Sequence, residues 1–365
     1  MQLSLSQHTL ATIAGNHASL AGDAGKNPVA TQIVARNGRV AFTTTNASGS
    51  LTLRDITQVA DAVDGDVAVS ASDLSKFAAA MPNGNVVLKL EGPRLTLKAG
   101  KVTMQLSTIE VDSCPKVAFP TTKGSVIPAA DFVAAATKVI PAASGDVARG
   151  VLTGVNITAT SDGLRMVATD SCGLSLIDVS GMTAIPEGTS IIAPAAGMSL
   201  ICRLLADAGD VDVVLGENTM TLSTPTRRIM VRLLLGSYPH YEPILEVVKN
   251  TVVVMSKNDL LNAIKRVKLA AAHDNATAFR MRVDTTSGTV SVSHVGDPNS
   301  DPIDQIDATV SGADISIAFN PDYLIMALRA ADGDEVSMAF NSALKPASIT
   351  GNGGTALSIA MPLRV

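Results

Sequence analysis

The sequence has no tryptophan, and aromatic residues make up only 3% of its 365 positions. Hydrophobic residues nevertheless account for 46% of the chain, so its cores must be built mainly from aliphatic side chains. A chain of this length suits two or three domains of ordinary size.

Cysteine and histidine are also scarce. The three cysteines, Cys114, Cys172 and Cys202, are far apart and form no CxxC pair, which argues against a zinc site or a disulfide framework. None of the five histidines lies in a recognisable catalytic context, and there is no nucleophile elbow, phosphate loop or HExxH motif. Thr169-Asp170 is better explained as a turn that ends a strand. We therefore expect neither an enzyme nor a cofactor.

Long apolar runs are missing as well. The least polar stretch, residues 191–202, is too short to span a membrane and contains Pro194 and Gly197. The N-terminus alternates like a strand and lacks the charged start and apolar core of a signal peptide. These features predict a soluble cytoplasmic protein.

Positive charge is in deficit, with 28 Lys and Arg against 33 Asp and Glu and a net charge of −5. This balance alone favours a protein that never meets nucleic acid. Net charge does not describe distribution, however, so the positions of the basic residues decide the question.

An internal repeat organises the chain. Segments typical of short helices recur at nearly equal intervals, one set around Leu10, Phe132 and Leu260 and another around Leu74, Ile201 and Leu324. Turn residues and two alternating runs follow each member of the second set. The paired runs are Val86–Leu90 with Arg94–Lys98, Val211–Leu215 with Thr219–Ser223, and Val336–Phe340 with Ala347–Thr350. The pattern predicts an α+β fold of three repeated domains, 1–120, 121–246 and 247–365, each with two helices packed on antiparallel sheet.

Basic residues gather on one face of these predicted helices. On a helical wheel, Lys76, Lys138, Arg203 and Lys265 lie opposite the apolar stripes. Arg266 also opposes its stripe, Lys268 flanks it, and Arg329 lies near the equivalent position of the third repeat, which Met326 occupies. Single, spaced cations of this kind suit sequence-independent contact with phosphates rather than base reading.

Several segments resemble the beta sliding clamp of bacterial DNA polymerase III. They are Arg149–Ile157, Asp162–Leu174, Tyr238–Leu245, Phe319–Leu324 and Met361–Val365, whereas the first third shares only its layout and Lys26-Asn27-Pro28. The resemblance implies two chains joined head to tail as a ring around duplex DNA, with sheets outside and helices inside. It adds Lys26 and Arg149 to the predicted DNA-contacting residues. It also implies polymerase and an ATP-driven clamp loader as partners.

The resemblance further implies a hydrophobic cleft that captures a short peptide from these partners. Carried over residue by residue, its wall would be formed by Leu152, Thr169, Leu174, Val247, Tyr323, Met361, Pro362, Leu363 and Arg364. The family's Gly-His-Arg is replaced here by Ser171-Cys172-Gly173, and a common proline by Glu246. These departures suggest a partner with an adapted motif.

An acidic scaffold that binds only proteins is the main alternative. Such a protein would share the repeat and the cleft but would not need basic helix faces. Replacing Lys76, Lys138, Arg203 and Lys265 with Glu separates the two hypotheses, since only a clamp would lose retention on circular DNA.

Overall fold

The computed structural model describes residues 1–21, 28–271, 278–295 and 304–364. The chain divides into two compact units, Met1–Ala130 with Arg203–Leu233 and Asp131–Cys202 with Leu234–Val365. Over the described residues, each unit contains one sheet of twelve strands. Within the same ranges, the helices fall short of the length and apolar character needed to cross a membrane.

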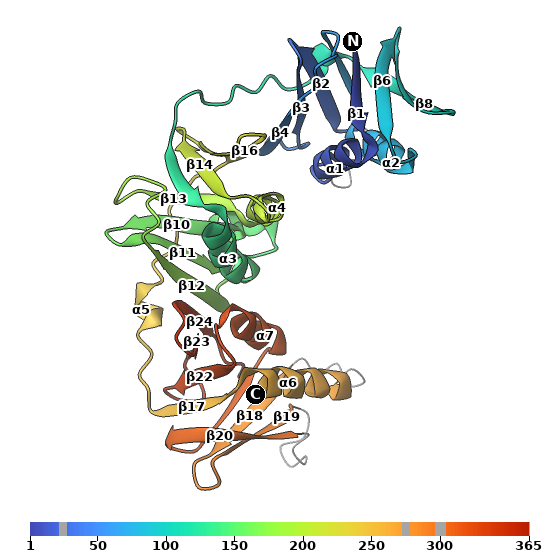
Figure 1. The fold of residues 1–365 in the computed structure, drawn as a ribbon. Coiled ribbons are helices and arrows are strands. Elements are labelled where there is room, and N and C mark those ends of the chain that lie inside the picture. Colours follow the sequence, from blue (N-terminus) through green and yellow to red (C-terminus); the bar gives the residue numbers. More distant parts are fainter. Residues whose placement is uncertain (22–27, 272–277, 296–303, 365) are drawn as a thin grey trace. The chain divides into compact units, whose positions relative to one another are not determined.

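The sheet of the first unit is antiparallel throughout. Its order is β1 (Gln2–Ser6), β6 (Asn85–Glu91), β7 (Arg94–Ala99), β8 (Val102–Ile109), β5 (Gly65–Ser70), β2 (Ala30–Arg36), β3 (Arg39–Thr45), β4 (Leu51–Gln58), β16 (Arg227–Arg232), β15 (Thr219–Ser223), β14 (Asp210–Leu215) and β9 (Ser125–Pro128). Helices α1 (Gln7–Ala18) and α2 (Ala71–Ala80) pack side by side against it (Figure 1).

The second unit follows the same plan. Its sheet order is β13 (Ser190–Pro194), β10 (Gly154–Thr160), β11 (Gly163–Thr169), β12 (Gly173–Ser180), β24 (Ala356–Ala360), β23 (Ala347–Gly351), β22 (Glu335–Phe340), β17 (Thr251–Ser256), β20 (Asp304–Gly312), β19 (Thr289–His294), β18 (Phe279–Asp284) and β21 (Ile315–Phe319). Helices α6 (Lys257–Ala271) and α7 (Pro321–Ala330) pack together over one part of it (Figure 1).

The order of elements repeats three times along the chain: a strand, a helix, four strands, a helix and three strands. The middle copy begins at β9 and contains helices α3 (Ala129–Val139) and α4 (Ala195–Leu205), with short 3-10 turns η2 (Ile140–Ala142) and η3 (Val147–Thr153) after α3. Two short helices, η1 (Val111–Ser113) and α5 (Glu242–Leu245), lie between the copies. This confirms the α+β repeat, its six helices and its three hairpins β6–β7, β14–β15 and β22–β23.

Hydroxyl and amide side chains set the helix starts. Ser6, Ser70, Ser256 and Asn320 each stand where a strand passes directly into a helix, and each accepts a hydrogen bond from a backbone N–H of the first turn. Such caps satisfy donors that have no partner within the helix. The strand-to-helix corners are thus encoded locally.

Aliphatic side chains dominate both cores, as the composition predicts. Leu10 and Leu74 from the helices meet Phe42 and strand residues in the first unit, all fully buried. Leu260 from α6 and Phe279 from β18 lie in the corresponding core of the second unit.

Successive copies join by pairing their strands. β4 of the first copy pairs with β16 of the second, from Arg227↔Asp55 to Val231↔Leu51. β12 of the second copy pairs with β24 of the third, from Gly173↔Ala360 to Ile177↔Ala356. Because each sheet runs across a join, contacts alone do not separate the copies, and the domain limits at 120 and 246 stay predictions.

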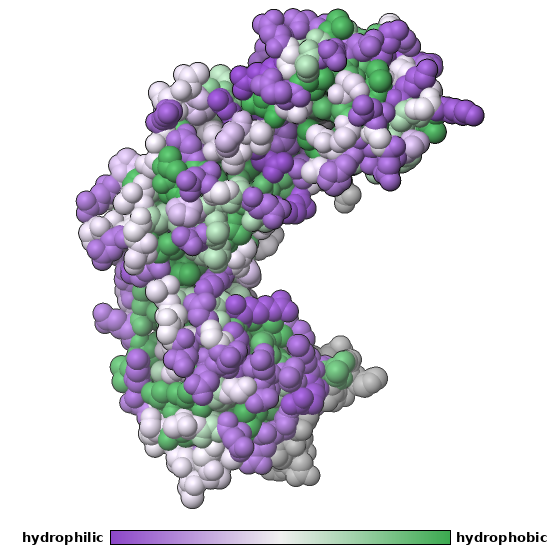
Figure 2. Space-filling view, in the orientation of Figure 1, coloured by the Kyte–Doolittle hydropathy of each residue, from purple (hydrophilic) through white to green (hydrophobic). Residues whose placement is uncertain are grey.

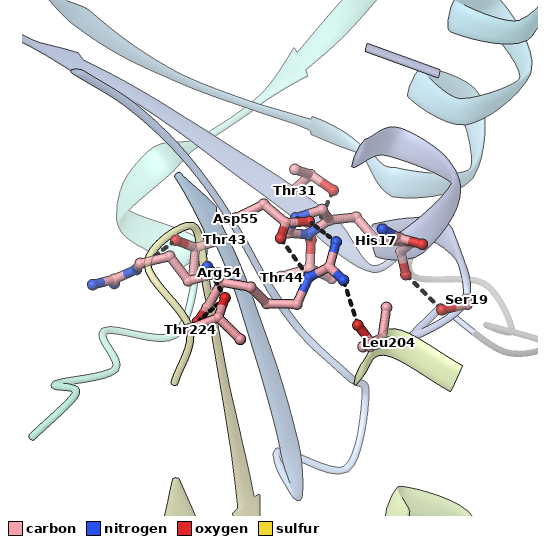
Figure 3. A network of polar contacts seen from close by, with 11 residues as sticks. His17, Ser19, Thr31, Thr43, Thr44, Arg54, Asp55, Leu204 and Thr224 are labelled. Atoms are coloured by element: carbon pink, nitrogen blue, oxygen red, sulfur yellow. Dashed lines mark hydrogen bonds and ion pairs between the residues drawn. The ribbon is translucent and has the colours of Figure 1, made fainter. Parts of the chain in front are cut away.

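A buried polar network supports the β4–β16 join (Figure 3). Asp55 accepts a hydrogen bond of 2.7 Å from Nε of Arg227, and Nη1 of Arg227 donates to the carbonyl of Leu204 at 2.6 Å. The join between the two copies is therefore linked to the end of α4 as well as by its strand ladder.

His17 of α1 completes this network from the other side (Figure 3). Its Nδ1 lies 2.8 Å from the hydroxyl of Thr44, whereas its Nε2 lies 3.5 Å from Oδ2 of Asp55. The second distance is too long for a strong hydrogen bond. Burial lowers the pKa of His17, although the Asp55 carboxylate opposes this. We conclude that the ring is neutral, because Arg227 already balances Asp55.

Candidate functional site

The helices present their basic residues as predicted. Lys76 of α2, Arg203 of α4, Lys265 of α6 and Arg329 of α7 are all exposed. The opposing stripes are buried at Leu74, Ala78, Met81, Phe132, Ala136, Val139, Ile201, Leu204, Leu205, Leu260, Ile264 and Val267. In the space-filling view, hydrophilic residues predominate over α6 and α7 (Figure 2). The predicted Lys26 lies outside the described residues.

Other predicted cations are bound to acidic residues at the starts of helices and strands or in turns. Lys138 of α3 forms an ion pair with Asp332 in the turn after α7, and its side chain is only 24% exposed. Arg266 pairs with Asp304, and Lys268 Nζ lies 2.6 Å from Asp322. Lys76 is only weakly paired, since its Nζ lies 4.0 Å from Asp73. The wheel identified the exposed cations but not these distant carboxylates.

Arg149 lies apart from the helix faces. It is exposed in η3, and its guanidinium donates to the carbonyl of Asp170. The structure thus places this residue beside the predicted peptide-binding residues of the β11–β12 turn.

The β11–β12 turn, residues 170–173, is held by a dense set of hydrogen bonds. The Asp170 carboxylate accepts from the backbone N–H groups of Cys172 and Gly173, both at 2.9 Å. The Tyr323 hydroxyl donates to the same carboxylate at 2.6 Å. Burial, followed by this contact with Asp170, raises the pKa of Tyr323. Met361 N–H donates to the carbonyl of Cys172 at 3.0 Å, so three predicted segments converge on this turn.

Two residues of the Ser171-Cys172-Gly173 segment, which differs from the family's Gly-His-Arg, have structural consequences. Ser171 has φ of +77°, a left-handed conformation that favours glycine. At Gly173, an added Cβ would lie 2.8 Å from Cδ1 of Tyr323 and 3.0 Å from Cε of Met326. The Tyr323 ring therefore occupies space that any larger residue at position 173 would need.

An apolar cluster lies on the strands beside this turn. It joins buried Leu174 and Leu176 of β12 to Ile359 of β24, with Tyr241 above them and Val247 packed against the cluster. The remaining members are Val167, Tyr238, Leu245 and Leu357. The structure thus brings the predicted Leu174 and Val247 together.

Sequence reasoning assigned no role to the two tyrosines of this cluster. Tyr238 accepts a hydrogen bond of 3.0 Å at its hydroxyl from the backbone N–H of Thr169, and Tyr241 is buried. Both lie within the Tyr-Pro-His-Tyr segment, so the motif was visible. Only the packing shows that the segment lies against β12.

The C-terminal segment runs past the same region. Pro362 forms an isolated bridge with Phe319, and Leu363 N–H donates to the carbonyl of Ala318 at 2.8 Å. Met361 is 41% exposed and Arg364 is exposed, so both remain accessible to a ligand. Leu152 is half-buried in η3.

Glu246 belongs to a neighbouring groove of about 360 Å³. Its lining includes Pro243, Ile244, Val247, Val248, Asn341, Lys345 and Pro346. Ile244 and Val248 are exposed apolar residues, so the groove offers apolar area next to Glu246. A short peptide with apolar side chains fits such a surface.

Comparison with known proteins gives consistent results. The family models for the central and C-terminal domains of the DNA polymerase III beta subunit match residues 126–240 and 246–364. The chain is 27% identical to the beta sliding clamp of Streptomyces coelicolor over 294 residues, covering 79% of this chain and 77% of that protein. It is 24% identical to the Bacillus subtilis beta sliding clamp over 307 residues, covering 82% and 80%.

Solved structures agree over the whole chain. The DNA polymerase III subunit beta of Pseudomonas aeruginosa superposes with a TM-score of 0.90 at 20% identity, covering 100% of both chains. The beta subunit of Thermotoga maritima gives a TM-score of 0.89 at 20% identity, covering 100% of this chain and 99% of that one.

Proposed function

The chain belongs to the DNA polymerase III beta subunit family, and from this premise we propose that it is a sliding clamp that encircles duplex DNA and tethers polymerase to it. The observation that carries the proposal is the threefold repeat, in which helices of every copy expose cations on the side away from the sheet. Such a clamp acts topologically and needs no catalytic groups. Weak phosphate contacts suffice because a closed ring cannot leave circular DNA.

Unpaired strand edges support a ring of two chains. The fourth strand of one copy pairs with the last strand of the next at both β4–β16 and β12–β24. The corresponding strands left over are β20 and β8. Among described residues, β20 pairs with β19 over 304–307 and with β17 only over 308–312, while β8 pairs with β7 over 102–107 and with β5 only at 108–109. Each strand thus keeps a free edge of the kind that joins the other copies.

Charge at these edges is complementary. The β7–β8 hairpin exposes Arg94, Lys98 and Lys101, whereas the free half of β20 carries Asp304 and the exposed Asp307. Two antiparallel β8–β20 joins would close a head-to-tail homodimer with six domains. The domain limits proposed for each chain are 120 and 246.

DNA contact is proposed for the helix faces. Among described residues, Arg203, Lys265 and Arg329 have no carboxylate within ion-pair distance, so they are the cations most available to phosphates. Four other cations would exchange their carboxylate partners within the chain for DNA phosphates: Lys76, Lys138, Arg266 and Lys268. Lys26 and Arg149 also remain among the residues proposed to contact DNA. Binding of this kind is independent of sequence and weakens as salt rises.

Partner proteins are proposed to bind at a cleft formed by the β11–β12 turn, Tyr323 and the C-terminal segment. Ser171-Cys172-Gly173 and Glu246 replace residues common in the family, so we infer a partner motif adapted to this surface. An ATP-driven loader would open the ring in the cytoplasm. A scaffold without a DNA role is not favoured, because it leaves the exposed helix cations without a purpose.

Molar mass and DNA retention test the proposal together. Light scattering should give about twice the 37.4 kDa chain mass at micromolar concentration. After loading onto primed circular DNA, a triple variant Arg203→Glu, Lys265→Glu and Arg329→Glu should be retained less well than wild type. A matched control changes the exposed Arg39, Lys116 and Lys123 to Glu. A strict monomer, or equal retention of both variants, would contradict the proposal.

A further inference from the structure

The joins between copies are built on the same register but carry different side chains. Each join contains five consecutive pairs of facing residues, so the two joins can be aligned pair by pair. The pair Arg54↔Arg228 at the β4–β16 join corresponds to Leu176↔Leu357 at the β12–β24 join. The second pair belongs to the apolar cluster beside the β11–β12 turn. The β4–β16 join therefore has a pair of positively charged residues where the β12–β24 join has a pair of leucines.

The correspondence extends along these strands and to the connecting segments. Thr52 corresponds to Leu174. Arg232 lies on the same face of β16 as Arg228 and Met230, and it corresponds to Met361. Phe119, which packs over Arg54, plays the part that Tyr241 plays over the apolar cluster. Arginine and threonine thus stand at several positions of the β4–β16 join where the β12–β24 join has apolar residues.

Arg54 and Arg228 face away from the helices. Their strand neighbours Asp55 and Arg227 point toward α1 and α4, and alternation turns residues 54 and 228 to the opposite face. Figure 3 shows the Arg54 side chain leaving β4 on the side opposite Asp55. Neither of these two outward guanidinium groups has a carboxylate partner among the described residues.

The contacts that these two arginines do make leave most of their donors free. Arg54 donates from Nε to Thr43 at 3.0 Å and from Nη2 to the carbonyl of Val117 at 3.5 Å. Arg228 donates from Nη1 to the carbonyl of Pro120, also at 3.5 Å. The Phe119 ring centre lies 4.5 Å from Cζ of Arg54. Each guanidinium has five N–H donors, and the two bonds of 3.5 Å are weak ones.

Like charges directly opposite each other on paired strands repel, and partial burial strengthens the repulsion. Burial and the neighbouring Arg228 lower the pKa of Arg54 accordingly. An anion that binds both guanidinium groups removes the repulsion and satisfies the free donors, because carboxylates match the planar fork of arginine.

We propose that Arg54 and Arg228, extended by Arg232, form a binding site for an acidic peptide segment of a partner protein. The charge of the surface fits carboxylate side chains, and its position repeats that of the apolar cluster at the other join. The two joins would then offer partner proteins surfaces of different chemistry, one apolar and one cationic. This proposal rests on the strand registers and the unpaired arginines, and it holds whether or not the chain closes into a ring.

The test measures binding of a fluorescein-labelled oligoglutamate peptide to the full chain by fluorescence anisotropy. The double variant Arg54→Gln with Arg228→Gln should bind about tenfold more weakly than wild type, the loss expected for one charge-assisted contact. The matched control, Arg36→Gln with Arg39→Gln, changes two exposed arginines of the same unit and should bind as wild type does. Inorganic phosphate should compete only at much higher concentration if the site selects peptide carboxylates; equal potency would instead assign it to a free anion and overturn the peptide proposal.

A second variant guards against a folding defect. Arg54→Leu with Arg228→Leu reproduces the pair found at the β12–β24 join and should keep the fold while losing the peptide. If the arginines serve only to hold residues 117–120, both double variants will lower the melting temperature and leave peptide affinity unchanged, which overturns the proposal. Photo-crosslinking of the labelled peptide to wild type should mark β4 and β16, and labelling elsewhere would also contradict it.

Discussion

The carboxylate of Asp55 lies 2.7 Å from Nε of Arg227, and the two residues come from strands of different copies of the repeat. The Asp55 side chain is only 6% exposed and that of Arg227 21%. A buried pair of this kind need not add net stability, but removing one partner strands the other charge. The pair therefore commits β4 and β16 to each other.

Replacing Asp55 with Asn should destabilise the protein by about 3 kcal/mol, because Arg227 would keep its charge without a carboxylate. Urea unfolding of the full chain measures the loss of unfolding free energy. The matched control is Asp66→Asn, whose partner Arg36 is 3.8 Å away and exposed. That change should cost less than about 1 kcal/mol. Equal effects of the two substitutions would show that the buried pair does not hold the join.

His17 should make stability depend on pH in a defined window. Burial lowers the pKa of His17 in the folded chain below its ordinary value of 6.5, so the unfolded chain binds more protons as the pH falls through that value. Stability should be fully present above about pH 6.5 and should decline below it. Although burial opposes it, the neighbouring His17 and Arg227 lower the pKa of Asp55, so the loss due to that carboxyl comes in a separate, more acidic window.

Melting temperatures recorded at a series of pH values check this prediction. The variant His17→Gln should be less stable near neutrality but should lose the dependence on pH that sets in below about pH 6.5. A wild-type melting temperature that rises on acidification through this range would mean that the buried ring is charged beside Asp55.

Local patterns made most of the fold predictable. The helix around Leu74 and the β6–β7 hairpin follow from periodicity and from turn residues that lie within a few positions of each other. The Lys138–Asp332 pair joins residues 194 positions apart, and no local pattern specifies it. The opposition of Arg54 and Arg228 likewise depends on the register between two copies, which only the folded sheets define.

Gly173→Ala tests the fit between the β11–β12 turn and Tyr323. The new Cβ would lie 2.8 Å from the Tyr323 ring, so the ring must move and its hydrogen bond to Asp170 must lengthen. We expect a loss of about 1–3 kcal/mol, typical of overpacking, and weaker binding of any peptide that uses Tyr323. Gly145→Ala is the control, because nothing lies within 4 Å of its added Cβ. If both variants unfold like wild type, the turn is more adaptable than its packing indicates.

Ser171→Gly should instead stabilise the chain. At φ of +77° a serine pays for its Cβ, whereas glycine adopts this conformation without strain, and the greater freedom of glycine in the unfolded chain offsets part of the gain. We expect a net gain of about 0.5–1 kcal/mol, measured by urea unfolding of the second unit. Ser171→Ala keeps the Cβ and should give no gain, which separates backbone strain from loss of the hydroxyl. If alanine stabilised as much as glycine, the hydroxyl rather than the backbone would be the source of the strain, and the glycine common at this position of the family would need another explanation.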